Sequence, residues 1–375
     1  MPEKIKQLFY QKLTYEKLIA AHYRAKKHKS SKGEILRYEL NLESNIMNLL
    51  DDLKNKRYRV GAYRQFTIYE PKARIIKSLP YKDRIVHQWI VEEFIKPYIT
   101  PRLIETTFAC IVNRGTHASA NQMQRYMRRL YNKNIDYWVL KCDIRKFFYS
   151  INPEILYKIL QKYISDADLL YLIKIILFDN RDPNEKIGIP IGNYTSQYFA
   201  NIYLNELDQY IKRTLKVKYY VRYMDDFVLL LPSKEDCKKC KKLIGDFLAK
   251  NLELSLNEKT KYYPCKMGVD FCGYRLFPTH ALLRNSNKTK IKNCIRHWNK
   301  QYASHTLNVN HAIMSFNSWY GHAIHCNSYN LINRMINKCA FLESAKNFSE
   351  TEKYLISLIE EDKRQARLKK KSIHK

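Results

Sequence analysis

Residues 218–231 read KYYVRYMDDFVLLL, so that two apolar runs flank the adjacent acids Asp225 and Asp226. Aromatic and β-branched residues favour strands, and aspartate is common in turns. The stretch therefore predicts a strand–turn–strand unit with both carboxylates at the turn. Adjacent carboxylates repel each other, and a bound cation would relieve that repulsion, whereas the alternative is an ordinary exposed turn. The apolar flanks favour a central hairpin, and with it the cation site.

A third acid ends another apolar segment, DYWVLKCDI at residues 136–144. This segment predicts a buried strand, and Asp143 at its end is expected to point out from the edge of the sheet. Mg²⁺ takes oxygen ligands and keeps substrate phosphates in its shell. Carboxylates from these two distant segments predict a site for two Mg²⁺ ions, with Mn²⁺ as an alternative, that clamps the attacking and leaving oxygens of a phosphoryl transfer.

Helical and strand patterns follow each other along the chain without a regular β–α–β order, which favours an α+β fold. Apolar residues at helical spacing predict helices from Pro153 onward and over residues 1–55, 81–100, 195–214 and 233–250. Ser233 and Asp236 are expected to cap the helix at 233–250.

Strands are predicted where aromatic and β-branched residues gather, at 58–60 and 66–69, and a basic hairpin follows at 71–77. Residues 281–375 read as helical and strongly basic, and they end in a polybasic run from Arg364 to Lys371. That run is either a solvated end or a contact with nucleic acid.

The charge balance points to a polyanionic partner. Among 375 residues, 67 Lys and Arg stand against 36 Asp and Glu, a formal net charge of +31. Basic side chains that neutralise phosphates release condensed counterions, so such an excess favours nucleic acid over a basic surface kept for solubility. A chain of this length predicts two or three subdomains. No apolar signal segment or run of about 18 apolar residues occurs, which predicts a soluble cytoplasmic protein without membrane contact.

The cysteines and histidines do not predict a zinc site. Of nine cysteines only Cys237 and Cys240 form a C-x-x-C pair, and no second pair stands at zinc-ribbon spacing. Free thiols are therefore expected. The histidines lack paired metal-ligand spacing as well, so core or RNA-contacting roles are expected for His87, His117, His280 and His322.

The acidic motifs resemble those of reverse transcriptases. Tyr223-Met224-Asp225-Asp226 resembles the YxDD motif of that family, and Asp143 with Phe147-Phe148 resembles its first catalytic block. Three further blocks follow in the family's order, namely GIPIGNYTSQ at 188–197, LNEKT at 256–260 and FCGY at 271–274. A YxDD alone is common, but five blocks in order over about 200 residues are highly specific.

The chain resembles in particular the reverse transcriptases of diversity-generating retroelements, which are related to those of group II introns and retrons. Ser196-Gln197 at the end of the fourth block is typical of them. Shorter similar stretches lie at 69–72, 82–84, 114–117, 278–280 and 318–322, so the resemblance covers roughly residues 55–330. It implies a right-hand polymerase fold with a small antiparallel palm sheet. The implied parts are an N-terminal helical extension at 1–54, fingers and palm at 55–284, a helical thumb at 285–345 and a basic C-terminal extension at 346–375.

The resemblance also implies roles at the catalytic centre. Asp143 and Asp225 are the expected metal ligands, with the Ile144 carbonyl as a third, and Asp226 is a neighbouring acid that supports them. Lys259 is the implied proton donor to the leaving pyrophosphate, with a solvated lysine as the alternative.

Further implied roles concern the substrates. Lys72 and Arg74 would bind the incoming triphosphate, since arginine grips phosphate in a bidentate way; exposed hairpin charge is the alternative. Phe148 would pack against the sugar and reject a 2′-hydroxyl, with a core phenylalanine as the alternative. Other substrate-binding positions are Gly192 and Gln197. The segment Phe271, Cys272, Gly273 and Tyr274 resembles the primer grip.

One position departs from the wider family pattern. Ile191 stands where many relatives have glutamine, and isoleucine cannot hydrogen-bond a template base. In the diversity-generating family this block is linked to errors at template adenines, so low fidelity there is expected. The implied partners are a template RNA, an RNA/DNA hybrid, deoxynucleotides, a structured noncoding RNA and a small basic accessory protein, typically pentameric.

Three other functions remain open on the sequence. The protein is expected to be prokaryotic or phage-encoded. The first of the other functions is a prokaryotic antiphage polymerase that copies a dedicated noncoding RNA, because it would share the same catalytic blocks. The second is an RNA-binding protein without activity, which the intact Asp143, Asp225 and Asp226 disfavour. The third is a group II intron maturase, disfavoured because no C-terminal nuclease or DNA-binding block is evident.

Overall fold

The computed structural model describes residues 3–69, 73–179 and 187–344. The chain divides into two compact units, Met1–Cys272 and Gly273–Lys375. The predicted triphosphate ligand Lys72 and the predicted basic extension at 346–375 lie outside the described residues. The predicted subdomain boundaries at 54/55, 284/285 and 345/346 stay predictions.

A four-stranded antiparallel sheet forms the centre of the first unit, in the order β4-β5-β3-β6. Its strands are β3 (Trp138–Cys142), β4 (Tyr219–Tyr223), β5 (Asp226–Leu231) and β6 (Lys261–Pro264). The strand at 136–144 and the hairpin at 218–231 are thus confirmed, whereas no pattern predicts β6.

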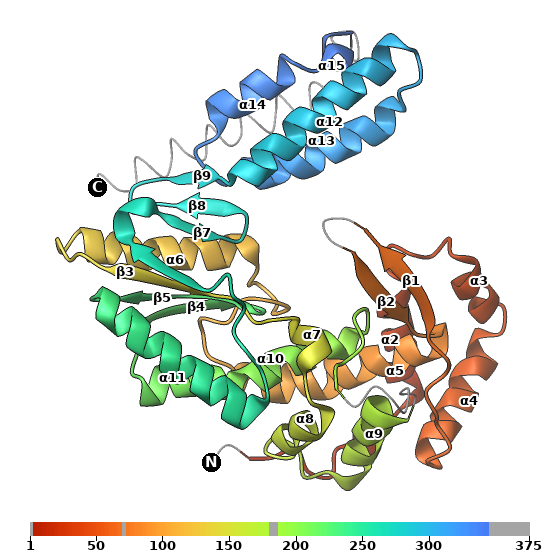
Figure 1. Ribbon diagram of the computed structural model, residues 1–375. Coiled ribbons are helices and arrows are strands. Elements are labelled where there is room, and N and C mark those ends of the chain that lie inside the picture. Colours follow the sequence, from red (N-terminus) through yellow and green to blue (C-terminus); the bar gives the residue numbers. More distant parts are fainter. Residues whose placement is uncertain (1–2, 70–72, 180–186, 345–375) are drawn as a thin grey trace, which may run out of the picture. The chain divides into compact units, whose positions relative to one another are not determined.

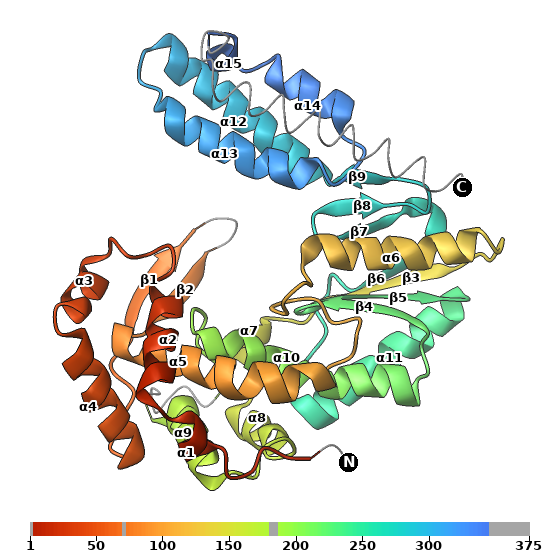
Figure 2. The same ribbon diagram turned by 180° about the vertical axis from the view of Figure 1, so that it is seen from behind.

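Helices cover both faces of this sheet. Figures 1 and 2 show α6 (Thr116–Tyr131) along one face and α11 (Lys234–Leu252) along the other. Residues 227–231 of β5 are therefore buried on both faces, which explains their uninterrupted apolar sequence. Leu140, Phe227 and Leu229 are fully buried in the main core. The predicted cap of α11 is confirmed, since the Ser233 hydroxyl accepts the Asp236 N–H at 3.0 Å.

The N-terminal segment is helical, as predicted. It forms α1 (Phe9–Lys12), α2 (Tyr15–Lys26), α3 (Gly33–Glu39) and α4 (Leu42–Lys54). α2 packs on α5 (Tyr81–Ile90), which continues as a π-helix over Val91–Ile99 and a 3₁₀ turn over Thr100–Arg102. The predicted helix at 81–100 is thus confirmed.

A two-stranded hairpin of β1 (Arg64–Ile68) and β2 (Arg74–Ser78) lies beside these helices (Figure 1). The predicted strand at 58–60 is wrong, because these residues join no ladder. Instead, the buried Tyr58 donates its hydroxyl to Asp83 at 2.7 Å, and the Gly61 N–H donates to the same carboxylate at 3.0 Å. These side-chain bonds take the place of a partner strand.

The first unit contains further helices, which pack mainly on other helices. Pro153 begins a helix as predicted, and the predicted helix at 195–214 is confirmed with a π-helical end. The helices are α7 (Phe147–Ser150), α8 (Pro153–Leu160), α9 (Ala167–Phe178), α10 (Tyr194–Gln209) and the π-helix Tyr210–Thr214. A short strand, β7 (Val269–Phe271), ends the unit after a 3₁₀ turn at Cys265–Met267.

The second unit opens with an antiparallel pair, β8 (Tyr274–Leu276) and β9 (Ala281–Leu283), so the wholly helical prediction for 281–375 is wrong at its start. The helices that follow confirm it as far as residue 344: α12 (Asn285–Ala303), α13 (Val309–Ala323), α14 (Tyr329–Ile336) and α15 (Ala340–Ser344). They pack around a separate core that includes Ile295, Trp298 and Met335.

The structure describes all nine cysteines, and none of them is paired in a disulfide. None of the helices in residues 3–69, 73–179 and 187–344 is both long and apolar enough to cross a membrane.

Candidate active site

The register of the central sheet brings the predicted carboxylates together. Cys142 of β3 pairs with Phe227 of β5, and Tyr223 of β4 pairs with Asp226. Asp143 follows Cys142 directly, so it leaves the sheet beside the two-residue turn of Met224 and Asp225. Acids that are about 80 residues apart in the chain therefore converge at one end of the sheet.

The charges of this cluster act on Asp225. The pKa of Asp225 is raised to about 6, and burial is the main cause. The negative charges of Asp143 and Asp226 raise this pKa further, whereas the positive charge of Arg74 lowers it. A carboxylate that is hard to ionise beside two others is a place where a divalent cation would be favourable. Carboxylate oxygens are ligands that Mg²⁺ accepts, and the expected site for two such ions stays a prediction.

Asp226 is already paired with a cation of the protein. Lys141 Nζ donates to both oxygens of Asp226 at 2.8 Å and to the Asp270 carbonyl at 2.7 Å. Lys141 lies on β3, two residues before Asp143, and Asp143 is the first residue after that strand. Since Lys141 occupies the Asp226 carboxylate, Asp143 and Asp225 are the carboxylates available to an ion.

Backbone and substrate oxygens would have to complete the coordination. Within the described ranges, no three His, Cys, Asp or Glu side chains form a cluster that could hold a metal. Ile144 is buried and forms an isolated antiparallel bridge with Leu256. The hydrogen bonds of that bridge are made by the residues on either side of the pair. The Arg145 N–H donates to the Ser255 carbonyl, and the Asn257 N–H donates to the Asp143 carbonyl. The Ile144 carbonyl therefore lies on the side away from Leu256.

Asn257 fixes the position of Asp143. Its side-chain amide donates to Asp143 Oδ2 at 2.8 Å, and its backbone N–H donates to the Asp143 carbonyl at 2.7 Å. Asn257 Oδ1 in turn accepts the Lys259 N–H at 3.1 Å. Lys259, the predicted proton donor, is exposed on this loop, and its general-acid role stays a prediction.

The predicted nucleotide-binding residues Arg74 and Phe148 lie on two different elements. Arg74 is exposed at the start of β2, and its charge reaches Asp225, where it lowers the pKa. Phe148 is half-buried on α7, packs against the main core and has its ring 5.6 Å from that of Phe147. Its carbonyl accepts the Ile189 N–H at 2.8 Å, which ties α7 to the fourth block.

The fourth block closes one side of a cavity of about 380 Å³. The Lys77 N–H of the β1–β2 hairpin donates to the Ile191 carbonyl at 3.1 Å, and Gly192 follows with a φ of 124°. The cavity is lined by residues that include Tyr63, Gln65, Lys77, Tyr149, Ile191 and Asn193. Gln197 is exposed on the first turns of α10, where it accepts a bond from the Cys110 thiol.

The segment that resembles a primer grip crosses the boundary between the two units. In the first unit, Phe271 is fully buried, with Lys141 Nζ 5.6 Å from its ring centre, and the Cys272 thiol lies 3.0 Å from the Ser119 hydroxyl. In the second unit, Gly273 has a φ of 86°, and the buried Tyr274 donates its hydroxyl to the His322 carbonyl at 2.9 Å.

Lys141 and Asn257 are site residues that the sequence analysis did not identify. Lys141 lies within the apolar segment that predicts a strand, and Asn257 lies within the LNEKT block, and neither pattern predicts a contact with the acids. A lysine two positions before a strand-end acid is a usable signal, because alternation places both on one face. The pairing of Asn257 with Asp143 has no local signal, because 114 residues separate them.

Comparison with known proteins agrees with this geometry. Residues 61–276, more than half of the chain, match the family described as reverse transcriptase (RNA-dependent DNA polymerase). The COX1/OXI3 intron 2 protein of Saccharomyces cerevisiae is 27% identical over 36% of this chain and 23% of its own length. Protein YkfC of Escherichia coli is 29% identical over 37% of this chain and 46% of its own. The matched region thus spans less than half of these relatives.

Two solved telomerase structures show a weak overall similarity. Apo telomerase from Candida tropicalis is 15% identical with a TM-score of 0.43, covering 64% of this chain and 58% of that one. Telomerase from Candida albicans, in complex with a fragment of telomeric RNA, is 12% identical with a TM-score of 0.45, covering 78% and 62%. The family match and the α+β architecture with its carboxylates at the end of a small antiparallel sheet lead to one conclusion: the chain belongs to the reverse transcriptase family and has the right-hand polymerase fold.

Proposed function

We propose that this protein is an RNA-directed DNA polymerase that adds deoxynucleotides to a primer end along an RNA template. The observation that carries the proposal is the convergence of Asp143 and Asp225 at one end of the central sheet, within the residues that match the family. Ionisation of Asp225 is disfavoured there relative to a free carboxyl, because burial and two neighbouring carboxylates raise its pKa to about 6. Such a cluster suits divalent cations and the phosphates bound to them.

The side chains of this chain have separate roles in the proposed reaction. Bound Mg²⁺ or Mn²⁺ would activate the primer hydroxyl and stabilise the charge on the leaving pyrophosphate. Asp143 and Asp225 would hold the ions, and Asn257 keeps the Asp143 carboxylate in one orientation. Arg74 at the start of β2 would bind the triphosphate, because guanidinium donors match phosphate oxygens. Phe148 would face the sugar of the incoming nucleotide and exclude a 2′-hydroxyl.

We further propose a role in a diversity-generating retroelement. The proposal rests on the resemblance of the fourth block, where Ser196-Gln197 ends the motif and Ile191 replaces the glutamine of other relatives. Without a hydrogen-bonding side chain at 191, discrimination opposite template adenine is expected to be poor. The partners would be a structured RNA and a small basic accessory protein, and the net charge of +31 suits the RNA. The alternative is an antiphage polymerase that copies a dedicated noncoding RNA.

Primer extension tests the activity. Purified protein with a primed RNA template, deoxynucleotides and MgCl₂ is expected to lengthen the primer, and EDTA should stop the reaction. Asp225→Ala is expected to remove all product. Asp246→Ala is the matched control, since Asp246 is exposed on α11. Extension by the Asp225→Ala variant at the rate of the wild type would refute the proposed chemistry.

Sequencing tests the biological role. RNA that copurifies with the protein should contain a template repeat, that is, the segment that the polymerase copies. The cDNA made from it should carry substitutions concentrated opposite the adenines of that repeat. A dedicated noncoding RNA copied without such a bias would instead support the antiphage alternative. If incorporation on a defined template showed no adenine bias, the fidelity proposal for Ile191 would be wrong.

A further inference from the structure

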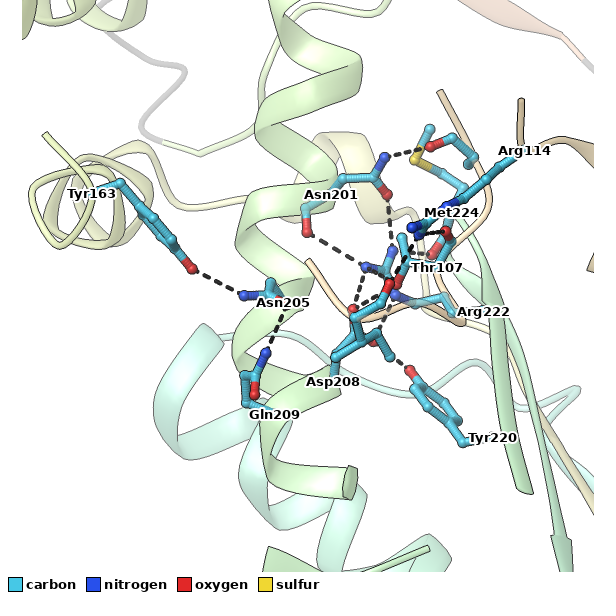
Figure 3. A network of polar contacts seen from close by, with 12 residues as sticks. Thr107, Arg114, Tyr163, Asn201, Asn205, Asp208, Gln209, Tyr220, Arg222 and Met224 are labelled. Carbon is cyan, nitrogen blue, oxygen red and sulfur yellow. Dashed lines mark hydrogen bonds and ion pairs between the residues drawn. The ribbon is translucent and has the colours of Figure 1, made fainter. Parts of the chain in front are cut away.

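Arg222, on β4, carries a fully buried charge close to the catalytic turn. Its guanidinium forms a bidentate ion pair with Asp208 of α10, which is also fully buried (Figure 3). Nε donates to Oδ1 at 2.8 Å and Nη2 donates to Oδ2 at 2.5 Å. Buried charges are stable only when every polar atom finds a partner, so the other guanidinium donors need acceptors as well.

Those acceptors include the backbone of the turn itself. Nη1 donates to the Asn201 side-chain oxygen and to the Met224 carbonyl, both at 3.0 Å, and Nη2 also reaches the Thr107 hydroxyl at 3.3 Å. Figure 3 shows these contacts radiating from one guanidinium. Arg222 thus connects α10 and residue 107 directly to the residue that precedes Asp225.

The network leaves the guanidinium little freedom to move. Asp208 accepts the Tyr220 hydroxyl at 2.6 Å and the Thr107 hydroxyl at 3.0 Å, so both of its oxygens are held from two sides. The Arg222 backbone is fixed too, because its N–H donates to Thr106 and its carbonyl accepts from Phe108. A donor anchored in this way defines where the Met224 carbonyl can lie.

The position of the Met224 carbonyl determines the direction of Asp225. The carbonyl of Met224 and the N–H of Asp225 belong to one planar peptide unit, so holding the oxygen sets the plane from which the Asp225 side chain departs. Met224 has a φ of 57°, in the left-handed region that residues other than glycine rarely adopt. A turn in this conformation benefits from an external bond that keeps it there.

We propose that Arg222 is a positioning residue for the reaction: held by Asp208, its guanidinium fixes the Met224 carbonyl and thereby orients the Asp225 carboxylate toward the ions. The inference rests on the proposed polymerase function. It assigns Arg222 no contact with substrate or metal. It predicts that loosening this guanidinium weakens the use of Mg²⁺ and slows catalysis, while binding of the primer–template is retained.

Arg222→Lys is the first test, because lysine keeps the charge but cannot hold Asp208 and Met224 together. In a folded variant, kcat is expected to fall about tenfold or more, since small displacements of reacting groups cost that much. The MgCl₂ concentration for half-maximal extension should rise several-fold, with an unchanged Kd for a primed RNA template. Tyr203→Phe is the matched control. Tyr203 lies on α10, as Asp208 does, and its hydroxyl donates a buried hydrogen bond to the Leu252 carbonyl, which is outside the Arg222 network. The MgCl₂ midpoint of this variant should equal that of the wild type.

A second measurement does not depend on activity. Hydrogen exchange of the turn amides at 223–227, without added metal, should be faster in Arg222→Lys, while exchange of β3 stays unchanged. If the lysine variant does not fold, Thr107→Val replaces it, because valine keeps the shape and loses the hydroxyl, and Thr107→Ser is its control. Valine should raise the MgCl₂ midpoint and serine should not.

The outcomes separate this inference from the proposed function. A folded Arg222→Lys with the wild-type midpoint and wild-type exchange at the turn would overturn the positioning role, as would equal midpoints for the two Thr107 variants. If the wild type itself incorporates no nucleotide, the polymerase proposal fails. Hydrogen exchange of the turn then decides alone whether Arg222 holds it.

Discussion

Asn257 holds Asp143 through two hydrogen bonds, from its side-chain amide to the carboxylate at 2.8 Å and from its backbone N–H to the carbonyl at 2.7 Å. The residue therefore fixes both the loop that carries the acid and the direction of the acid itself. A carboxylate held in one orientation binds an ion without losing side-chain freedom at that step. Asn257 thus contributes to the site without being a ligand.

We predict that Asn257→Ala lowers kcat of primer extension about tenfold, because a misplaced ligand costs much of the rate. Stability should fall by only about 1 kcal/mol, the usual value of one hydrogen bond. The measurement combines steady-state extension with urea unfolding. Asn251→Ala is the control, since Asn251 is exposed on α11 and bonds only to the Phe247 carbonyl in the residues that the structure describes. Equal rates for the two variants would contradict the role of Asn257.

Lys141 neutralises Asp226, and its removal should change the pH dependence of the reaction. Lys141→Met removes this cation from Asp226, so the negative charge of Asp226, which already raises the pKa of Asp225, should act on Asp225 more strongly. Asp225 should then ionise only at a higher pH. The acidic side of the pH–rate profile of primer extension should therefore shift upward by about one pH unit, the usual effect of a nearby like charge on a carboxyl pKa. A rate profile from pH 5.5 to 9 tests this.

The control for Lys141 is a lysine outside the cluster. Lys162→Met removes an exposed ion pair with Glu206, so its pH profile should match that of the wild type. A Lys141→Met profile with an unmoved acidic limb, at whatever absolute rate, would show that Asp226 does not act on Asp225 through its charge.

Asp225 should destabilise the protein at neutral pH when no metal is present. Its pKa is raised to about 6 in the folded state, so ionisation opposes folding, and the cost is present above that pH and disappears as the pH falls toward the value of the unfolded chain. Asp225→Asn removes the ionisable group. In EDTA at pH 7.5 the variant should be more stable by about 1–3 kcal/mol, the scale of a raised pKa of this size.

Urea unfolding at two pH values checks this sign. Near pH 4 the difference between Asp225→Asn and the wild type should be close to zero. MgCl₂ should raise the melting temperature of the wild type more than that of the variant, because an ion that binds the folded state stabilises it by mass action. A variant less stable than the wild type at pH 7.5 in EDTA would contradict the raised pKa.

The catalytic hairpin and strand were predictable because their signals are local. Apolar runs that end in acids mark strands at any position, and the acids Asp143 and Asp225 stood at the ends of such runs. Register then brings the two acids together, and register is set by the pairing of β3 with β5 rather than by either segment alone. Convergence was therefore a hypothesis until the sheet was known.

The features that the sequence did not predict depend on contacts distant in the chain. Tyr58 looked like a strand residue, but its hydroxyl bonds to Asp83, which no local pattern reveals. Arg222 interrupts an apolar strand, and only the position of Asp208 on α10 explains how its charge can be buried. Tertiary contacts determine which buried polar groups pair, so secondary-structure propensity and the spacing of apolar residues do not reveal these pairs.

Gly192 lies where the fourth block meets the β1–β2 hairpin, since the Lys77 N–H donates to the carbonyl of the preceding residue, Ile191. A Cβ at this position would lie 3.0 Å from the Lys77 carbonyl and 3.1 Å from Ile76 Cγ2, and its φ is 124°. Gly192→Ala should therefore lower the free energy of unfolding by about 1–3 kcal/mol and weaken deoxynucleotide use, seen as a raised KM, because the hairpin that carries Arg74 loses its support.

Gly115→Ala is the matched control for Gly192, since a Cβ there meets nothing within 4 Å and its φ of 174° is ordinary extended backbone. Its unfolding energy and KM should remain close to those of the wild type. The raised KM is the informative result, because instability alone would lower the active fraction and leave KM unchanged. A Gly192→Ala variant with an unchanged KM would mean that the fourth block does not support nucleotide binding through this contact.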